Sequence, residues 1–433
     1  MKVAHSALSD QGLVRKNNED SFVCDDDLQL YIVADGMGGH AGGEVASAMA
    51  CSEVTDAILR NRELLDEYQA GTGDTNDRDI RMLLSVAVQR ASTAIREKGE
   101  AQPELRGMGT TIEVALFIKS RAFVAHVGDS RVYLIRNGEM HQITRDHSLA
   151  NQLKDLGRIQ NEDEIKPRFR NAVTRALGFY ESVEVDVLDM DLFPGDRFLM
   201  CSDGLHGFVG QEEILRCSAK NQRELAVQHL VRQANSKGGK DNITVVIVEV
   251  ADIPEEHGRR VAERLDVLRN LVLFRRLDYE ELLRINNVIQ EVSFREGAPI
   301  FAEGQGGEEM FIILAGSVCI RRGDVEIARL GKGTHFGEMA MVDRQERSAD
   351  AVALEETICL SLARKDFYEL VQNHSITGVK LLWNLSRVLA LRLRTTTAEL
   401  EGLKNAYKKS IEAEMADPAA DPFEDTFQDR AVE

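Results

Sequence analysis

A chain of 433 residues is too long for one ordinary hydrophobic core, so we expect two folded domains joined by linkers. The hydrophobic fraction of 43% and the charged fraction of 29% are typical of a soluble globular protein. The formal net charge of -19 argues against a general nucleic-acid-binding protein, which needs positive charge to neutralise phosphates. No apolar run reaches the roughly eighteen residues of a membrane-spanning helix, and the first residues lack the apolar core of a signal peptide. We therefore expect a cytoplasmic protein without a membrane partner.

The first 252 residues show strand patterns grouped with separate helical patterns. Short apolar runs bounded by polar turns predict strands at 28–34, 111–118, 122–127, 131–135, 139–143, 197–201 and 243–250. Helical periodicity predicts helices at 44–61, 78–98 and 222–235. This grouping favours an α+β sandwich over a chain of βαβ units.

The pattern changes after residue 252. Residues 253–276 carry Pro254 and then helical periodicity, which predicts a helical linker. Residues 277–374 contain short apolar runs punctuated by glycine, which predict a small β-barrel or jelly roll. A long helix is predicted at 375–411. Residues 412–433 hold eight carboxylates and one arginine, so we expect a disordered acidic tail.

The predicted final helix carries a seam near heptad spacing, formed by Leu382, Leu385, Leu389, Thr396, Leu400 and Leu403. Such a seam can join two copies of the chain in a parallel homodimer, or it can pack on the chain's own barrel. We favour the homodimer. No helix-turn-helix pattern follows this helix and the tail is acidic, so DNA binding is not expected.

Five aspartates stand at the ends of predicted strands, in glycine-rich surroundings: Asp20, Asp35, Asp129, Asp203 and Asp241. Carboxylates gathered at strand ends repel one another and need a compensating charge, for which Mg²⁺ or Mn²⁺ is suited. Two such ions can activate a shared water near neutral pH, and a nearby arginine can hold a phosphate. The chemistry indicated is hydrolysis of a phosphate ester without a covalent enzyme intermediate.

These aspartates belong to an ordered set of motifs that resembles the type 2C (PPM) family of protein phosphatases. The motifs are Arg15-x-x-x-Glu19-Asp20, Asp35-Gly36-x-Gly38-Gly39, Gly109-Thr110-Thr111, Gly128-Asp129-Ser130-Arg131, Ser202-Asp203-Gly204 and Asp241-Asn242. The family's whole domain matches residues 1 to about 250. The resemblance implies a four-layer α-β-β-α sandwich that hydrolyses phosphoserine and phosphothreonine in proteins.

The resemblance also implies metal ligands, namely Asp20, Asp35, Gly36, Asp129, Asp203 and Asp241. Asp35 would bridge two ions, the Gly36 carbonyl would bind one of them, and Asp129 matches the ligand of a third, weaker ion. Asp203 and Asp241 would complete the protein ligands of the first ion.

Catalytic roles are implied for Arg15, Glu19, Asp20 and Asp35. Arg15 would clamp the substrate phosphate, while Glu19 and Asp20 would hold metal or metal-bound water. Residues 146–178 look like the family's flap, which borders the substrate groove.

Met37 departs from many eukaryotic members of the family, which have a histidine there that is proposed as general acid; bacterial-type members also have methionine. Methionine cannot donate a proton. His40 is a nearby alternative acid, although a structural role at the start of a helix is favoured for it.

Residues 336–349 contain the elements of a phosphate-binding cassette. Gly337 lets the backbone approach an anion, a short helix is expected to open at Glu338, and Arg347 supplies a fork that neutralises phosphate. Glu338 can accept a hydrogen bond from a ribose hydroxyl. The step of nine residues between Glu338 and Arg347, inside a β-rich segment, makes the pattern specific.

The segment from about 271 to 403 resembles the cyclic-nucleotide-binding domain of catabolite activator proteins and protein kinase A regulatory subunits. The resemblance implies a ligand site formed by Gly337, Glu338, Arg347, Ser348, Ala349, Thr396 and Thr397. Glu338 would bind the ribose 2′-hydroxyl, Arg347 and Ser348 the cyclic phosphate, and the two threonines the adenine. This set favours cAMP, and Ser348 leaves cGMP open. Glu346 departs from the proline that often precedes the arginine.

The preferred hypothesis is therefore a serine/threonine protein phosphatase with two, or with Asp129 three, Mn²⁺ or Mg²⁺ ions, regulated by cAMP or cGMP. Its partners would be phosphorylated proteins and the cyclic nucleotide. Two alternatives stay open. The first domain could be a non-enzymatic phosphoprotein sensor or scaffold, or the second could serve an active phosphatase only for docking or dimerisation.

Overall fold

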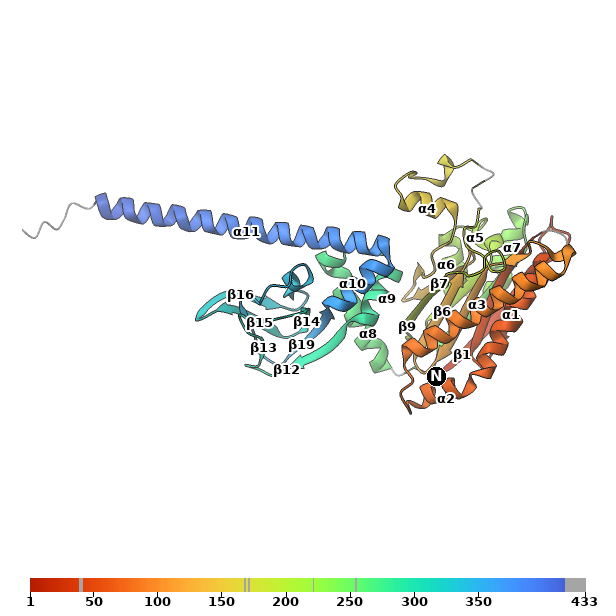
Figure 1. The fold of residues 1–433 in the computed structure, drawn as a ribbon, viewed down its shortest axis with the longest axis horizontal. Helices are drawn as coiled ribbons and strands as arrows, with labels where there is room; N and C mark the ends of the chain where they lie inside the picture. Colours follow the sequence, from red (N-terminus) through yellow and green to blue (C-terminus); the bar gives the residue numbers. More distant parts are fainter. Residues whose placement is uncertain (39–41, 167–168, 170–171, 221, 254, 417–433) are drawn as a thin grey trace, which may run out of the picture.

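The computed structural model describes residues 1–38, 42–166, 169, 172–220, 222–253 and 255–416. Figure 1 shows two lobes with a long helix running away from them, the first lobe at the N-terminal end of the chain. In these described ranges, no helix is both long enough and apolar enough to cross a membrane.

Two antiparallel sheets form the centre of the first lobe. One sheet has the order β1-β11-β10-β7-β8, with strands Lys2–Asp10, Ile243–Ala251, Arg197–Cys201, Arg131–Arg136 and Glu139–Gln142. The other has the order β2-β3-β5-β6-β9, with strands Asp20–Asp25, Leu30–Met37, Ile112–Ile118, Arg121–Val127 and Asp186–Asp191, and β4 (Gly109–Thr110) pairs with β3. Apolar side chains such as Tyr31, Phe117 and Phe198 fill the space between the sheets.

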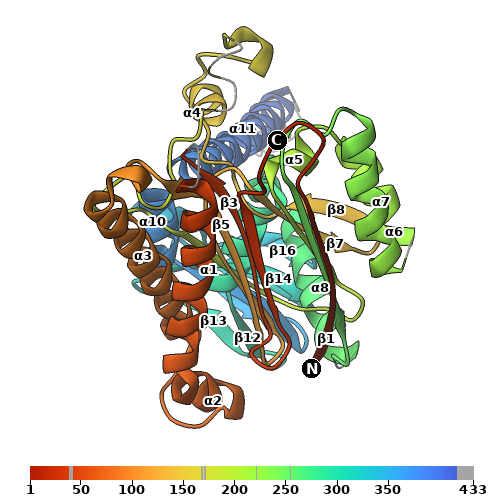
Figure 2. The same ribbon diagram turned by 90° about the vertical axis from the view of Figure 1, so that its right-hand side faces the viewer.

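Helices cover both outer faces of this pair of sheets, as Figure 2 shows. On one face lie α1 (Gly42–Arg60) and α3 (Asp77–Ala101), with α2 (Arg62–Ala70) and the short η1 (Pro103–Leu105) beside them. On the other lie α5 (Asp203–His206), α6 (Gln211–Lys220) and α7 (Arg223–Ser236). The predicted four-layer α-β-β-α sandwich is confirmed.

The expected flap projects from one end of the sandwich (Figures 1 and 2). Its described part includes α4 (Leu149–Asp155) and η2 (Glu162–Glu164). Ser148 caps α4 by accepting a hydrogen bond from the Asn151 N–H at 3.3 Å, which fixes where the helix begins.

The second lobe is a barrel of two four-stranded sheets. One has the order β12-β19-β14-β17, with strands Gln290–Phe294, Thr357–Ala363, Glu309–Ala315 and His335–Phe336. The other has the order β13-β18-β15-β16, with strands Pro299–Phe301, Asp350–Ala353, Ser317–Arg322 and Val325–Gly331. Inward-facing residues such as Phe311, Ile313 and Val318 form the apolar interior, so the predicted β-barrel is confirmed.

Helices join the barrel to the first lobe and close it. They are α8 (Glu255–Asn270), η4 (Val272–Phe274), α9 (Tyr279–Val288), η5 (Glu338–Met341), α10 (Arg364–Asn373) and α11 (Ser375–Ala416). The first helix of the segment predicted as the barrel, α9, precedes the barrel strands. Helix α9 begins at a capping box formed by Asp278 and Glu281, in which each side chain accepts a hydrogen bond from the other residue's backbone N–H.

The long helix α11 packs on the barrel only through its first half. Leu381 and Leu385 are buried there with the barrel's apolar residues, whereas every residue from 391 to 412 is exposed. The predicted heptad seam is therefore divided: Leu385 lies against the chain's own barrel, and Leu400 and Leu403 face solvent. Of the acidic tail predicted at 412–433, residues 412–416 belong to α11 instead, and residues 417–433 lie outside the described part of the chain.

Candidate functional site

The pairing of β2 with β3 places two of the predicted aspartates side by side. Asp20 lies directly opposite Asp35 in the antiparallel register. The Asp20 carboxylate accepts hydrogen bonds from the hydroxyls of Ser202, at 2.8 Å, and Thr244, at 2.7 Å. Its other oxygen, Oδ1, is buried without a partner among the described residues. Burial and the charges of nearby aspartates raise the pKa of Asp20 to about 7, although the two hydroxyls act in the opposite direction.

An open pocket of about 670 Å³ lies beside this pair. Its lining includes Arg15, Glu19, Asp35, Gly36, Met37, Asp129, Val173, Asp203 and Asp241. We call it the acidic pocket. Every predicted catalytic or metal-binding residue lines it except Asp20, the cross-strand partner of Asp35. Asp129 follows β6, Asp203 follows β10 and Asp241 precedes β11, so the fold brings together aspartates from segments far apart in the chain.

Burial, together with mutual repulsion, raises the pKa values of the aspartates in the acidic pocket. Burial, reinforced by four neighbouring aspartates, raises the pKa of Asp35 well above its usual range. Burial and the charge of Asp241 raise the pKa of Asp203 to about 6, which its hydrogen bond with Asp35 partly offsets. Burial and Asp203 raise the pKa of Asp129 to about 7. A cluster of this kind is stabilised by cations.

The oxygen-rich lining fits Mg²⁺ or Mn²⁺, which prefer carboxylate and carbonyl ligands. Within the described ranges, no three acidic, histidine or cysteine side chains already converge as a complete ligand set. Asp241 instead accepts a hydrogen bond from Arg15 at 2.8 Å. The unpartnered Asp20 oxygen and the raised carboxyl pKa values are the observations that support a cation here.

Close backbone packing explains the glycine next to Asp35. A Cβ at Gly36 would lie 2.2 Å from the Gly43 carbonyl oxygen and 2.5 Å from that of Glu19. The Gly36 N–H donates to the Glu19 carbonyl at 3.1 Å. Any side chain at this position would therefore separate the Glu19 loop from Asp35.

Asn242 belongs to the Asp241-Asn242 motif, but the sequence analysis gave it no role. Its amide donates to the carbonyls of Gln11 and Asn17, both at 2.9 Å, and its carbonyl accepts from the Glu19 N–H at 2.9 Å. One buried side chain thus holds the loop that carries Arg15 and Glu19. The available signal was its position immediately after Asp241.

Met37 and His40 are the two residues considered for the position of the general acid. Met37 lines the acidic pocket, where its thioether has no proton to give. His40, the alternative acid, lies outside the described residues.

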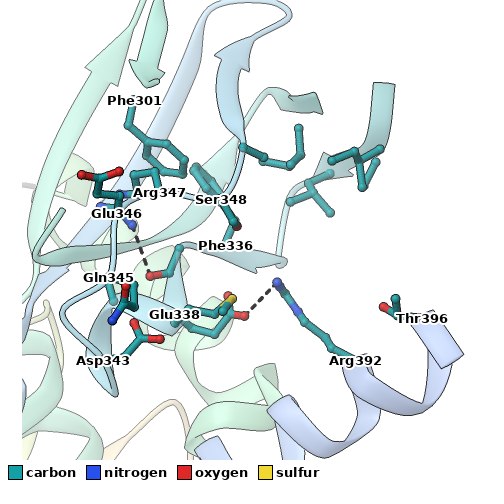
Figure 3. A pocket seen from close by; sticks show the side chains of 18 of the residues that line it. Phe301, Phe336, Glu338, Asp343, Gln345, Glu346, Arg347, Ser348, Arg392 and Thr396 are labelled. Carbon is teal, nitrogen blue, oxygen red and sulfur yellow. Dashed lines mark hydrogen bonds and ion pairs between the residues drawn. The ribbon is translucent and has the colours of Figure 1, made fainter. Parts of the chain in front are cut away.

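A second pocket, of about 470 Å³, lies between the barrel and α11. We call it the barrel pocket, and Figure 3 shows many of its residues. Its lining includes Gly337, Glu338, Arg347, Ser348, Ala349 and Thr396, all predicted for the ligand site. Gly337 has a left-handed backbone, with φ of 75°, and a Cβ there would lie 2.7 Å from an Arg347 guanidinium nitrogen. Glycine therefore suits both the turn and the close approach of Arg347.

Glu338 is fully buried beside the barrel pocket, at 0% exposure. Its Oε1 lies 2.8 Å from an Arg392 guanidinium nitrogen (Figure 3), yet neither carboxylate oxygen has a well-aligned hydrogen-bond donor in the described part of the chain. Burial raises the pKa of Glu338, and the charge of Arg392 opposes that shift. Sequence reasoning missed Arg392, because only the path of α11 brings it to Glu338.

Arg347 is held at the wall of the barrel pocket by backbone and an aromatic ring. It donates to the Glu309 carbonyl at 2.7 Å and to the Gly337 carbonyl at 3.4 Å. The guanidinium carbon lies 4.2 Å from the centroid of the Phe301 ring. Its Nε is buried beside Gly307 and has no partner among the described residues.

The two threonines predicted to contact a base separate on α11. Thr396 lines the barrel pocket, as does Thr395. Thr397 is not part of the lining, and its hydroxyl donates to the Leu393 carbonyl at 2.8 Å. The physical reason is the turn of about 100° per residue in an α-helix, which moves neighbouring side chains to different faces.

Comparison with known proteins matches each lobe to a family model. Residues 14–237 match the model described as Protein phosphatase 2C, and residues 291–374 match Cyclic nucleotide-binding domain. The serine/threonine protein phosphatase PstP of Mycobacterium tuberculosis is 39% identical over 248 residues, which are 57% of this chain and 45% of the relative. The serine/threonine phosphatase stp of Listeria welshimeri is 38% identical over 246 residues, which are 56% of this chain and 93% of the relative.

Solved structures agree with these matches. The crystal structure of the Mycobacterium tuberculosis phosphatase PstP/Ppp has a TM-score of 0.51 and 38% identity, covering 58% of this chain and all of that one, 100%. The structure of the S. agalactiae serine/threonine phosphatase has a TM-score of 0.51 and 34% identity, covering 57% and 99%. The phosphatase 2C model covers more than half of the chain, and both predicted resemblances are confirmed. The chain therefore belongs to the protein phosphatase 2C family and carries a cyclic nucleotide-binding domain after its phosphatase domain.

Proposed function

We propose that this protein is a metal-dependent serine/threonine protein phosphatase whose rate is set by a cyclic nucleotide. One observation carries the catalytic half of the proposal: the acidic pocket combines mutually repelling carboxylates with Arg15 at the same opening. The family relatives named as serine/threonine phosphatases support the substrate class.

The residues of the acidic pocket have separable tasks in this reaction. Asp35, Asp203, Asp241, Asp129 and the Gly36 carbonyl would hold divalent cations, which when bound would supply Lewis-acid activation of a water nucleophile. Arg15 binds the substrate phosphate, for which its paired guanidinium nitrogens are suited. Asp20 pairs with Asp35 across β2–β3, and its unpartnered Oδ1 would hold a cation or its bound water. Asn242 keeps the loop of Arg15 and Glu19 in register with them.

We propose cAMP, in preference to cGMP, as the ligand of the barrel pocket. Glu338 is buried and lacks an aligned donor, which a ribose hydroxyl would provide. Arg347 and Ser348 lie together on the lining, where a cyclic phosphate would contact both. Thr396 and apolar residues of the same pocket, among them Leu330 and Leu391, suit a purine base.

We also propose that α11 joins two copies of the chain. Exposed apolar residues on its free half follow the four-three spacing of a coiled coil: Leu393, Leu400, Leu403 and Tyr407. Light scattering of the full-length protein tests this directly. A monomeric mass at micromolar concentration would exclude the dimer.

Hydrolysis of a phosphothreonine peptide by the full-length protein with Mn²⁺, titrated with cAMP and then cGMP, tests the central proposal. We expect a rate that requires Mn²⁺, is lost in Asp203→Asn and changes with cAMP at lower concentration than with cGMP. No hydrolysis at any nucleotide concentration would favour a phosphoprotein sensor. A rate that ignores both nucleotides would leave the second domain as a docking or dimerisation unit.

A further inference from the structure

Helix α9 lies between the two lobes and contacts both (Figure 1). Its Leu283 belongs to the buried cluster that fills the space between the phosphatase sheets, together with Val261 and Leu265 of α8. The regulatory domain is thus joined to the core of the phosphatase sandwich by apolar packing in addition to the chain connection.

Polar contacts from α9 reach the backbone of one phosphatase strand. The Asn287 amide donates to the Asp189 carbonyl of β9 at 2.7 Å, and its carbonyl accepts from Arg121 at 3.3 Å. Arg284 reaches the Val187 carbonyl of β9 at 3.4 Å. Strand β9 is an edge strand, paired only with β6 in its sheet, so its outer carbonyls are available to α9. Because these hydrogen bonds end on backbone carbonyls, a movement of α9 would displace strand β9 itself.

On its other side α9 is bound to α11 through one buried carboxylate. Glu281 accepts from the Thr377 hydroxyl at 2.9 Å and from the Lys380 ammonium at 2.5 Å. Twelve residues further along the same uninterrupted helix, Arg392 contacts Glu338 in the barrel pocket. That separation is about 18 Å of rigid helix. A ligand that shifts Arg392 or Thr396 therefore acts on Glu281 through a single element.

From β9 the contacts continue to the acidic pocket. Asp186 begins β9 and lies 3.2 Å from His147 and 3.0 Å from Arg175, which are in the flap. His147 is tied to Gly128 by two hydrogen bonds, one from the Gly128 N–H to Nδ1 at 3.1 Å and one from its own N–H to the Gly128 carbonyl at 2.7 Å. Gly128 directly precedes Asp129 of the acidic pocket.

We propose that α9 couples the barrel pocket to the flap of the phosphatase, with Glu281 as its contact to α11 and Asn287 as its contact to β9. This inference rests on the proposed function and names the element through which the nucleotide acts. Coupling requires that the ligand favour one of two positions of this element. The continuous contacts α11–Glu281, Asn287–β9 and Asp186–His147 provide the physical connection.

Asn287→Ala in the full-length protein tests the phosphatase side of this connection. We expect the variant to bind cAMP with unchanged affinity by calorimetry and to keep the nucleotide-free rate on phosphothreonine peptide. The factor by which cAMP changes that rate should fall at least about fivefold, since both interdomain hydrogen bonds of the Asn287 side chain, to the Asp189 carbonyl and from Arg121, are lost. Asn270→Ala is the matched control, because the Asn270 side chain bonds only Asp266 of its own helix. It should retain the wild-type response.

Hydrogen exchange provides a second readout that does not depend on turnover. In the wild type, cAMP should change the amide protection of α4 and of residues 172–178, and Asn287→Ala should abolish that change. Thr377→Val, at the α11 side, should have the same effect, and the two substitutions combined should add little because both break one connection.

The outcomes separate this inference from the proposed function. A full cAMP response in both Asn287→Ala and Thr377→Val would overturn α9 as the coupling element while the regulated phosphatase remains. Wild-type protein that binds cAMP without any change in α4 protection would also overturn it. Wild-type protein that neither binds cyclic nucleotide nor hydrolyses the peptide would overturn the proposed function, and this inference with it.

Discussion

Replacing Glu338 by glutamine should affect ligand binding and stability in opposite directions. The carboxylate is fully buried, at 0% exposure, and both of its oxygens lack an aligned donor among the described residues. A buried charged group in this state costs about 1–3 kcal/mol. Its ion pair with Arg392 offsets only part of that cost, because the Arg392 side chain is 48% exposed and screened by water.

The expected result is a gain of about 1 kcal/mol in the free energy of unfolding of the empty protein, seen as a rise of a few degrees in Tm. The affinity for cAMP should fall by about ten- to a hundredfold, since a hydrogen bond to a charged group contributes roughly 1.5–3 kcal/mol. Differential scanning fluorimetry without nucleotide and calorimetry with cAMP measure the two quantities. Glu346→Gln is a matched control on the rim of the same pocket.

The stability difference should also depend on pH in a defined direction. Burial raises the pKa of Glu338 above its ordinary value of 4.5, so the folded protein binds this proton more tightly than the unfolded chain does. Protonated Glu338 therefore contributes to the free energy of unfolding below pH 4.5, and this contribution is lost as pH rises through the pKa of the folded protein. The advantage of Glu338→Gln should be largest near neutral pH and shrink on acidification. A variant that melts lower than wild type at pH 7, or that keeps full cAMP affinity, would refute the reasoning.

Three further predictions follow from the two sites and the free helix. Asp203→Asn should reduce peptide hydrolysis by at least about a hundredfold yet raise the Tm of the metal-free protein, because it removes one of several repelling buried carboxylates; a lower Tm measured in chelator would contradict this. Asn242→Ala should lower kcat/KM by about tenfold, because the loop that carries Arg15 becomes less ordered. The lost hydrogen bonds should also lower the free energy of unfolding by about 1–3 kcal/mol. Unchanged kinetics would argue that other contacts hold the loop. Leu400→Glu should convert the proposed dimer to monomer in light scattering without lowering the Tm of either domain, because Leu400 is 52% exposed in the single chain.

The sequence predicted the local setting of the acidic residues but not their convergence in one pocket. Asp35-Gly36 and Asp203-Gly204 follow apolar runs and Asp241-Asn242 precedes one, so a site at strand ends was predictable from local pattern. That Asp129, Asp203 and Asp241 converge was not, because they are separated by up to 112 residues and their meeting depends on the order of strands in two sheets. The family resemblance supplied that information.

In the second domain, too, the local sequence pattern was readable and the contacts between distant residues were not. Gly337, Glu338 and Arg347 form a local cassette whose spacing could be read directly. Arg392 lies far along the chain on a helix whose path no local pattern specifies, so its contact with Glu338 was missed. The start of α9 could have been predicted from the Asp278–Glu281 capping box, but its packing against β9 is a tertiary property.

The exposed half of α11 links the proposed nucleotide response to the concentration of the protein. Residues 391–412, about 33 Å of helix, bury no side chain within the single chain. Most helical stability in proteins comes from packing of one face against other elements, so the proposed partner would add stability to this stretch. Thr396 lies in this stretch and lines the barrel pocket. If the partner is a second copy, helical order at that wall follows the law of mass action, and sensitivity to the nucleotide would rise with expression level.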